Sequence, residues 1–461
     1  MDTKTRRRHA PRGGLLSARY RALVIGLVVL VATSAFSRLG ISTALPSAAA
    51  ELDGQALYGA VLSTFTVANI VGLCLAGPMF DRFGIVKPLV VGVAFFAGGL
   101  LVATLAPSMA QLVAGRGLQG FGAGALSIAS YTAIAQGIPA ERRPAMLAVN
   151  ASAFTIPSMV GPVAAGALTD AASWRVVFAL LVPLAPLALL LARTPLRRID
   201  ADAGRSSDTA PRLTVSRKTL LGCLTFGGGV VAILLTPAVG AGAAWGVLAA
   251  GLVVSLIGLS RLMPRGTLRL RRGLPAHMTF AIGLSLAFFT TDLYLPLALT
   301  DLIGVSSGLA GAALTAGVIG WTGGAYVPAA VRRFGAAPSV LGVCSAVLVL
   351  LGMTGIALTI LLDLPFFLIL ISWAVAGCGA GVGFTSNAAA VLDLSASEPG
   401  KASSQMEVGN QAGIAIGTGV AGVIVAAAGV TGITMAQTLL VGAVGGAVAL
   451  VAALRFAVAD S

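Results

Sequence analysis

A succession of long apolar runs limits what this chain can fold into more than any other feature of its sequence. A membrane-spanning helix needs roughly 20 mainly apolar residues, because the helix rises about 1.5 Å per residue and the hydrocarbon core is about 30 Å thick. The chain contains runs of about that length at residues 22–45, 58–80, 88–106, 109–136, 146–169, 174–192, 219–237, 241–262, 279–303, 306–331, 337–362, 365–392, 403–428 and 432–457. The sequence therefore predicts an all-α membrane protein with 14 spans.

The composition agrees with a protein that is immersed in a membrane. Hydrophobic residues make up 57% of the chain and charged residues only 10%, whereas soluble domains carry about 25% charged residues. We expect no cleaved signal peptide, because the basic N-terminal tail leads into an apolar run that is too long for one. The four cysteines lie far apart within apolar runs, so their spacing indicates neither a disulfide nor a metal site.

The distribution of basic residues predicts the orientation in the membrane. If residues 1–21 lie in the cytoplasm, every Lys and Arg except Arg38, Arg116 and Arg175 falls in or next to a cytoplasmic segment. An excess of basic residues on the cytoplasmic side is the rule for membrane proteins. The net charge of +14 is thereby explained without a nucleic-acid partner. We expect a multi-pass protein of the cell (inner or plasma) membrane, with both termini in the cytoplasm.

Two polar, basic segments divide the runs into groups of six, two and six. We expect a six-helix bundle at each end of the chain. The extra hairpin between them is expected to pack on the periphery, with a role in gating as the alternative. The predicted parts are a tail at 1–21, a bundle at 22–192, a linker at 193–218, the hairpin at 219–262, a second linker at 263–278 and a bundle at 279–457.

The two groups of six runs resemble each other. Gly84 and Gly335 follow equivalent runs and lie 251 residues apart. The glycine cluster at 120–124 recurs at 377–381, an offset of 257 residues. Parallel halves related by an axis along the membrane normal are a transporter arrangement, with the substrate site between the halves. The alternative is that Gly- and Ala-rich helices align with one another without common ancestry.

Three short motifs resemble those of a known transporter family. They read Gly77-Pro-Met-Phe-Asp81-Arg82-Phe-Gly84, Arg116-Gly-Leu-Gln-Gly120 and Gly161-Pro162-Val-Ala-Ala-Gly166. By themselves, the glycines and prolines are explained by close helix packing and by a helix kink. Together with the number of runs, the motifs resemble the 14-span drug:proton antiporter branch of the major facilitator superfamily.

The resemblance implies two bundles that rock around a central site, with Arg116 taking part in a proton relay. It also implies that Asp81 docks at the N-terminus of the thirteenth run and closes the cytoplasmic side. The chain departs from the family pattern in two places. Two apolar residues separate Gly84 from Lys87, and Ser37 stands where the first helix of the family often carries an aspartate.

The ionisable residues within the runs are the candidates for proton coupling: Asp292, Arg38, Arg116 and Glu407. A charged side chain at membrane depth is costly unless it is paired or hydrated, and is a functional candidate for that reason. Asp292 lies near the middle of its run, so we expect it to carry the proton with Arg38 as its partner. A static ion pair is the alternative. Glu407 lies near the cytoplasmic end of its run and either carries the proton instead or extends to water.

The central cavity is expected to be mostly apolar with few polar groups. Such a cavity suits lipophilic or amphipathic compounds, although Arg38 could equally mark an anionic substrate. At the entrance of its helix, His277 is expected to be solvated. The candidate residues of the cavity wall are Phe65, Asn69, Tyr294, Trp321 and Asn387.

These observations predict a secondary active transporter that exports lipophilic or amphipathic compounds, drugs among them, by proton antiport and alternating access. An enzyme is not expected, because the sequence contains neither a nucleophile–base pair nor a metal-ligand cluster. The expected energy source is the proton gradient, without a cofactor. The expected partners are a small-molecule substrate and the lipid bilayer, with the chain as a monomer. Two alternatives stay open: an exporter of one endogenous metabolite or lipid, and a non-transporting receptor or scaffold.

Overall fold

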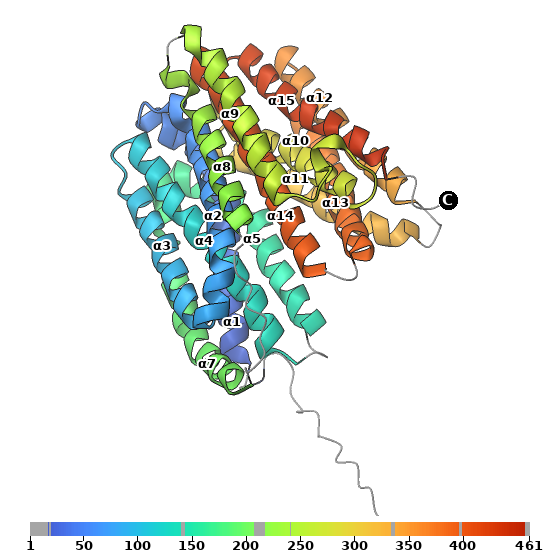
Figure 1. Cartoon of the computed structure of the whole chain (residues 1–461). Helices are drawn as coiled ribbons and strands as arrows, with labels where there is room; N and C mark the ends of the chain where they lie inside the picture. The colour runs from blue at the N-terminus through green and yellow to red at the C-terminus, as the bar shows by residue number, and fades with distance from the viewer. Residues whose placement is uncertain are drawn as a thin grey trace, which may run out of the picture.

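The computed structural model describes residues 17, 20–139, 143–206, 217–239, 241–332, 337–395 and 399–456. Within these ranges the regular elements are all helices and no strand forms, so the predicted all-α class is confirmed. Figure 1 shows the long helices side by side, with the first helices of the chain on one side of the molecule and the last helices on the other.

The helices follow the predicted apolar runs. Those of the N-terminal half are α1 (Arg21–Glu51), α2 (Tyr58–Phe83), α3 (Val86–Thr104), α4 (Met109–Gly137), α5 (Arg143–Ala171), α6 (Trp174–Ala179) and α7 (Leu184–Ser206), with the turn η1 (Gln55–Leu57). Between the halves lie α8 (Arg217–Leu234), η3 (Thr236–Ala238), α9 (Ala241–Leu262) and η4 (Thr267–Arg269). The C-terminal half contains α10 (Leu274–Asp301), α11 (Ser307–Arg332), α12 (Pro338–Leu361), α13 (Phe367–Leu394), α14 (Pro399–Ala428) and α15 (Gly432–Ala453).

Eleven helical segments of the described residues are long and apolar enough to cross a membrane. The helices α4, α5 and α11 contain 29, 29 and 26 residues and are long enough, but they are not among these eleven. Their glycines and polar side chains lower the mean hydropathy. The structure thus supports a multi-pass membrane protein with eleven apolar spans, and the predicted number of 14 depends on these three helices.

The sixth predicted run is interrupted and longer than expected. It consists of α6 and α7, with a break before Leu184. Pro183 lies in this break, and its ring nitrogen cannot donate a helical hydrogen bond. The helix α7 then continues to Ser206, into the segment that was expected to be a linker. Asp200 in this extension accepts hydrogen bonds from the backbone N–H groups of Ile85 (2.7 Å) and Val86 (3.1 Å), which anchors it to the start of α3.

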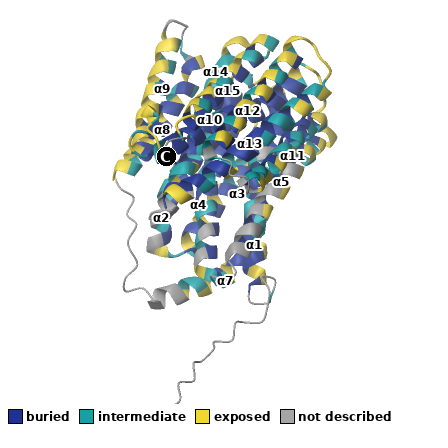
Figure 2. Ribbon diagram, turned by 90° about the vertical axis from the view of Figure 1, so that its right-hand side faces the viewer, coloured by how far each residue is buried: buried dark blue, intermediate teal, exposed yellow. Residues whose placement is uncertain are grey.

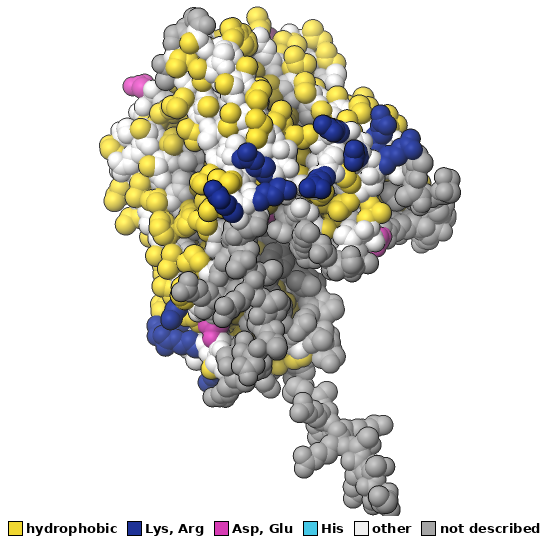
Figure 3. Space-filling view, viewed as in Figure 1, with side chains coloured by type: hydrophobic (Ala, Val, Ile, Leu, Met, Phe, Trp, Pro, Cys, Tyr) yellow, Lys and Arg dark blue, Asp and Glu magenta, His cyan; other side chains and the backbone are white. Residues whose placement is uncertain are grey.

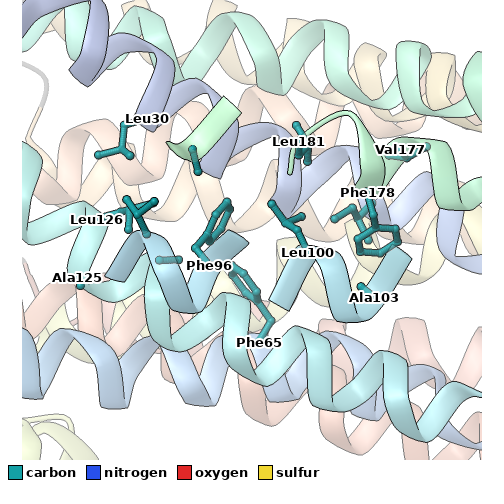
Figure 4. Packing of buried hydrophobic residues seen from close by; sticks show 14 of the residues in the cluster. Leu30, Phe65, Phe96, Leu100, Ala103, Ala125, Leu126, Val177, Phe178 and Leu181 are labelled. Carbon is teal, nitrogen blue, oxygen red and sulfur yellow. The ribbon is translucent and has the colours of Figure 1, made fainter. Parts of the chain in front are cut away.

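Each half has its own apolar core. The larger core lies mainly in the N-terminal half, where Phe65, Phe96, Leu100 and Phe178 pack between the helices (Figure 4). A second core fills the C-terminal half around Phe288 and other buried side chains. Figure 2 shows buried residues in the middle of the molecule and exposed residues along its outer helices. Many of the exposed side chains are large and apolar, as expected for a surface that contacts lipid.

The repeated glycine cluster packs in the same way in both halves. A Cβ atom added to Gly124 would lie 2.7 Å from the backbone oxygen of Asn69, so α4 and α2 approach to backbone contact. A Cβ atom added to Gly381 would lie 2.8 Å from the backbone nitrogen of Ala325, so α13 approaches α11 equally closely. Small residues allow such approaches between membrane helices. The two clusters therefore hold equivalent helix pairs together.

The extra hairpin of α8 and α9 lies over both halves. Cys223 and Phe226 of α8 belong to a third core that also contains Ile70 of α2 and Ala412 of α14. Figure 1 shows α8 and α9 in front of α2 and α14. The hairpin therefore covers the line along which the two halves meet, and does not pack on one half alone.

Candidate functional site

The two halves meet at one end of the bundle through hydrogen bonds. The backbone N–H groups of Ser307 (3.1 Å) and Gly308 (2.8 Å), at the start of α11, donate to the carboxylate of Asp170, at the end of α5. The side-chain amide of Gln55 donates to Asp301 over 3.0 Å. The hydroxyl of Tyr58 in α2 donates to a backbone oxygen of α10 over 3.2 Å. We call this end the closed end.

Close helix contacts between the halves lie on the same side of the molecule. A Cβ atom on Gly166 of α5 would lie 2.6 Å from the carbonyl carbon of Ser307, and one on Gly311 of α11 would lie 2.6 Å from that of Pro162. The predicted motif residues Pro162 and Gly166 thus lie in the contact between α5 and α11. Gly161 packs instead against Phe36 of α1, since a Cβ atom added there would lie 3.3 Å from the ring.

The closed end also carries an exposed ion pair. Glu51, at the end of α1, pairs with Arg175 and accepts a hydrogen bond of 2.8 Å from the indole nitrogen of Trp174. The hydrogen bonds from Arg175 and Trp174 lower the pKa of the Glu51 carboxyl below its usual value. Arg175 was one of three basic residues outside the predicted cytoplasmic segments, and Glu51 provides its partner.

The basic segment after α9 lies at the opposite end. Gln405, near the start of α14, donates a hydrogen bond of 3.2 Å to the backbone oxygen of Leu262. The arginines between Arg261 and Arg272 are exposed. Figure 3 shows a band of basic side chains on this face of the molecule. The two ends of the bundle therefore differ in charge as well as in contact.

A small cavity lies between the halves, on the inner side of the closed end. From the N-terminal half it is lined by Arg38, Leu62, Phe65, Thr66 and Arg116, and from the C-terminal half by Phe289, Leu293, Gln411 and Ile414. Helices α1, α2 and α4 thus face α10 and α14 across it. The wall is mostly apolar and contains two arginines.

Arg116 of α4 is almost completely buried, with 2% of its surface exposed. Its Nη1 donates to Oε1 of Gln119 over 2.8 Å and to the backbone oxygen of Ser37 over 3.3 Å. Its guanidinium lies over the ring of Phe65, at 4.2 Å from the ring centre. Its Nε has no hydrogen-bond partner among the described residues. The amide nitrogen of Gln119 donates to Gly99 over 3.1 Å, which fixes the acceptor that faces the arginine.

Arg38 of α1 lies on the same side of the cavity. Its guanidinium is 5.8 Å from the centre of the Phe65 ring, so the two arginines share one aromatic side chain. It interacts electrostatically with the carboxylate of Glu407 in α14. Glu407 is exposed and accepts a hydrogen bond of 2.9 Å from the side-chain amide of Gln411. Charged groups of the two halves therefore interact with each other.

Asp292 of α10 was expected to be the partner of Arg38. It is buried, with 4% of its surface exposed, and it does not belong to the cavity wall. Within the described residues it makes neither a hydrogen bond nor an ion pair. In this conformation the carboxylate that interacts electrostatically with Arg38 is Glu407.

Two of the expected cavity residues lie in contacts between helices. Asn69 donates a hydrogen bond of 3.5 Å to the backbone oxygen of Gly120, within the packing of α2 against α4. The hydroxyl of Tyr294 donates to the backbone oxygen of Thr418 over 2.9 Å, and the residue lines a separate small cavity among α10, α12 and α15. Phe65 is the residue of the expected set that lines the central cavity.

The other two expected cavity residues, Trp321 and Asn387, contact side chains of the C-terminal half. Trp321 stacks on Phe384, with ring centres 4.7 Å apart. The oxygen of Asn387 lies 2.8 Å from Nδ1 of His277, and the His277 ring stacks on Phe456 at 3.7 Å. The expectation that His277 is solvated is therefore wrong. The helix α10 begins at Leu274, which places His277 inside the bundle instead of before it.

The turn after α2 is described only in part. The side chains of Gly77, Asp81 and Arg82 lie outside the described residues, so their expected roles stay predictions. Gly84 ends α2 with a φ of 75°, a conformation that glycine adopts without strain. A Cβ atom added to Gly84 would lie 2.9 Å from the Asp200 carboxylate, so this position also needs a residue without a side chain.

Several groups that shape the site were not assigned partners from the sequence. Gln119 and Gln411 follow Arg116 and Glu407 at helical spacings of three and four residues, which could have identified them as partners on the same face. No spacing in the sequence indicates the partners of Asp170, because its carboxylate binds the start of a helix 137 residues away. Among the described residues, no three His, Cys, Asp or Glu side chains come together as a metal site.

Relatives of known name match either a part or most of this chain. Multidrug resistance protein 3 of Bacillus subtilis (strain 168) is 30% identical over 172 residues, which cover 37% of this chain and 34% of that protein. The chain thus spans only about a third of that relative's length. A "Probable multidrug-efflux transporter" of Mycobacterium tuberculosis (strain ATCC 25618 / H37Rv) is 28% identical over 432 residues, 87% of this chain and 86% of that protein.

Solved structures share the fold of this chain, and a family model matches its sequence. The POT family transporter PepTSo has a TM-score of 0.67 at 13% identity, covering 93% of this chain and 97% of that chain. A bacterial homologue of the human lysosomal transporter Spinster, in an inward-facing and unoccupied conformation, has a TM-score of 0.66 at 12% identity, with 95% and 98% covered. These likenesses show the fold. The model of the Major Facilitator Superfamily matches residues 27–292, more than half of the chain. The chain therefore belongs to the major facilitator superfamily, a family of transporters and not of enzymes.

Proposed function

We propose that this transporter exports lipophilic or amphipathic small molecules in exchange for protons. The observation that carries the proposal is the mostly apolar cavity between the halves, with Arg38 and Arg116 in its wall and Glu407 in electrostatic interaction with Arg38. Charged groups at membrane depth mark the pathways of substrates and protons. The name of the Mycobacterium tuberculosis relative as a probable multidrug-efflux transporter supports export as the direction.

Alternating access explains the unequal ends of the bundle. The contacts of α5 with α11 and of α2 with α14 seal the closed end, and Glu407 is exposed on the other side of the cavity. We place the basic segments in the cytoplasm, following the positive-inside rule. On this proposal the structure represents an inward-open conformation in the cell membrane, with both termini inside. Separation of the two contacts at the closed end would then release substrate outside.

The two carboxylates are given different roles in this proposal. Asp292 is buried and has no partner among the described residues, so protonation would not have to break an existing contact. Glu407 accepts a hydrogen bond from Gln411 and interacts electrostatically with Arg38, which suits a fixed counter-ion. Asp292 is therefore proposed as the proton carrier, as the sequence suggests, while the partner of Arg38 becomes Glu407. The helices α4, α5 and α11 complete the proposed 14 spans of a monomeric transporter.

Substrate-driven proton movement in proteoliposomes tests the proposal. A pH-sensitive dye reports proton flux when lipophilic cations, neutral antibiotics or organic anions are added to the purified protein. The comparison uses Asp292→Asn and Glu407→Gln, with Asp53→Asn at an exposed site of the closed end as the matched control. We expect coupled flux in the wild type and in Asp53→Asn, and its loss in Asp292→Asn.

The outcomes separate the parts of the proposal. Retained flux in Asp292→Asn together with its loss in Glu407→Gln would keep antiport and move the carrier to Glu407. Substrate uptake without proton movement would contradict antiport. If no compound of the panel causes proton flux in the wild type, broad export of such compounds would be contradicted and export of one endogenous substrate favoured.

A further inference from the structure

The charges around the central cavity do not balance. Of the described residues in its wall, Arg38 and Arg116 are cationic and none is acidic. Glu407, which is not part of this wall, interacts electrostatically with Arg38. One carboxylate against two guanidinium groups leaves an excess positive charge. Buried charges are stable only when they are paired and hydrogen-bonded, so the cavity is suited to an additional anion.

An unpaired hydrogen-bond donor of Arg116 also indicates a site for an anion. Its Nη1 is taken by Gln119 and by the backbone oxygen of Ser37, but its Nε lies buried without a partner in the described part of the chain. The guanidinium presents its donors in a planar fork that matches the two oxygens of a carboxylate. Arg116 therefore belongs to the cavity wall and has a buried donor without a partner among the described residues.

The rest of the wall favours an apolar body attached to that anion. Phe65 lies near both arginines, with ring-centre distances of 5.8 Å to Arg38 and 4.2 Å to Arg116. Opposite them, Phe289 and Leu293 of α10 belong to the wall, as does Ile414 of α14. An aromatic or aliphatic group can pack against these side chains while its charged end faces the arginines.

We propose that the cavity binds amphipathic organic anions, with a carboxylate between Arg38 and Arg116 and an apolar body against the α10 side. This inference rests on the proposed function and narrows its class of substrate. Glu407 competes with the substrate for Arg38. Export of an anion is electrically equivalent to inward movement of a positive charge, and import of a proton moves charge in the same direction. A membrane potential that is negative inside therefore drives the exchange together with the proton gradient.

Equilibrium binding to the purified full chain tests the inference without any gradient. The probes are 1-naphthylacetate, its neutral methyl ester and the cationic (1-naphthylmethyl)trimethylammonium, which share one apolar body. Binding is measured to the wild type, Arg38→Gln, Arg38→Lys, Arg116→Lys and Glu407→Gln. Arg217→Gln removes the same charge from an exposed position outside the cavity and is the matched control. Thermal unfolding of each variant shows whether it is folded. If Arg116→Lys does not fold, the comparison of Arg38→Gln with Arg38→Lys still tests the inference.

We expect the acid to bind about 10- to 100-fold more tightly than either analogue, the range for hydrogen bonds between charged groups. Arg38→Gln should remove this preference, Arg38→Lys should restore part of it, and Glu407→Gln should tighten binding of the acid. Arg217→Gln should resemble the wild type. Tighter binding of the cation, equal binding of acid and ester, no binding of the acid, or an unchanged preference in Arg38→Gln would overturn the inference. Anion binding without proton coupling would fail only the proposed function, and proton-coupled export of the cation would fail only this inference.

Discussion

The carboxylate of Asp170 accepts a hydrogen bond of 2.8 Å from the backbone N–H of Gly308, and this bond joins the two halves of the transporter at the closed end. Its other oxygen accepts from Ser307 over 3.1 Å. A carboxylate at a helix N-terminus gains from two backbone donors and from the helix dipole. The contact stabilises the conformation with this end closed, because separation of α5 from α11 must break both bonds.

Asp170→Asn should therefore shift the transporter toward opening of the closed end. The charge is lost while the size is kept, and a loss of about 1 to 2 kcal/mol corresponds to a shift of roughly 5- to 30-fold. The reaction rate of an introduced Ser47→Cys with a membrane-impermeant maleimide reports the opening, since Ser47 lies 3.4 Å from Ser307. Asp200→Asn is the matched control, because Asp200 caps α3 within one half. Equal rates in both variants would contradict a role in closure.

Gly166→Ala should impair closure through sterics. The new Cβ atom would lie 2.6 Å from the carbonyl carbon of Ser307, and a backbone cannot move aside as a flexible side chain does. We expect transport in proteoliposomes to fall about tenfold or more, since overpacking of well-packed contacts costs about 1 to 3 kcal/mol. Gly98→Ala in α3 is the control, because its Cβ would meet nothing within 4 Å. Full activity of Gly166→Ala would show that α5 and α11 need not approach so closely.

The ion pair at the closed end predicts a dependence of stability on pH. Arg175 and Trp174 lower the pKa of Glu51, so this group stabilises the fold above the pKa of the unfolded chain, and the contribution is lost as the pH falls through the lowered pKa. Acidification from pH 7 toward pH 3 should therefore reduce the melting temperature of the wild type more than that of Glu51→Gln. The difference should be small, because the side chains are 32% and 50% exposed. Parallel melting curves over this range of pH would contradict the assignment.

Two thiols test the position of the extra hairpin. Cys74 of α2 and Cys223 of α8 interact with each other, although 149 positions separate them in the sequence. Oxidation by copper phenanthroline should join them as a disulfide, with Cys344 and Cys378 replaced by serine. A protease site inserted between residues 207 and 216 then separates the chain into fragments that stay linked on a non-reducing gel. Cys74→Ser should abolish the link, and separated fragments in the parent chain would place the hairpin elsewhere.

The fold could be predicted well from sequence because the thickness of a bilayer sets the length of each helix. The glycine motifs of the sequence also predicted close helix packing, which the structure shows at Gly166, Gly124 and Gly381. The structure corrects the expected end of the sixth run, because α7 continues to Ser206 and is anchored by Asp200.

The side chains of the cavity could be predicted much less well. A helix such as α10 is apolar and buried on nearly all sides, so no periodic pattern indicates which face turns to the centre. Asn69 and Asn387 are polar and buried, but their partners are Gly120 and His277 in neighbouring helices. Such pairings depend on the rotation of each helix, which only tertiary packing determines.

Alternating access around the central cavity is tested most directly by distances across both ends of one molecule. Spin labels at Asp53→Cys and Ser306→Cys span the closed end, and labels at Lys87→Cys and Leu394→Cys span the opposite end, all at exposed positions in a background without native cysteines. Pulsed dipolar measurements compare each pair at neutral and acidic pH, with and without substrate. Alternating access predicts opposite changes, with the closed-end distance increasing in the conditions in which the other distance decreases. Distances that stay constant at both ends, or that increase together, would contradict it.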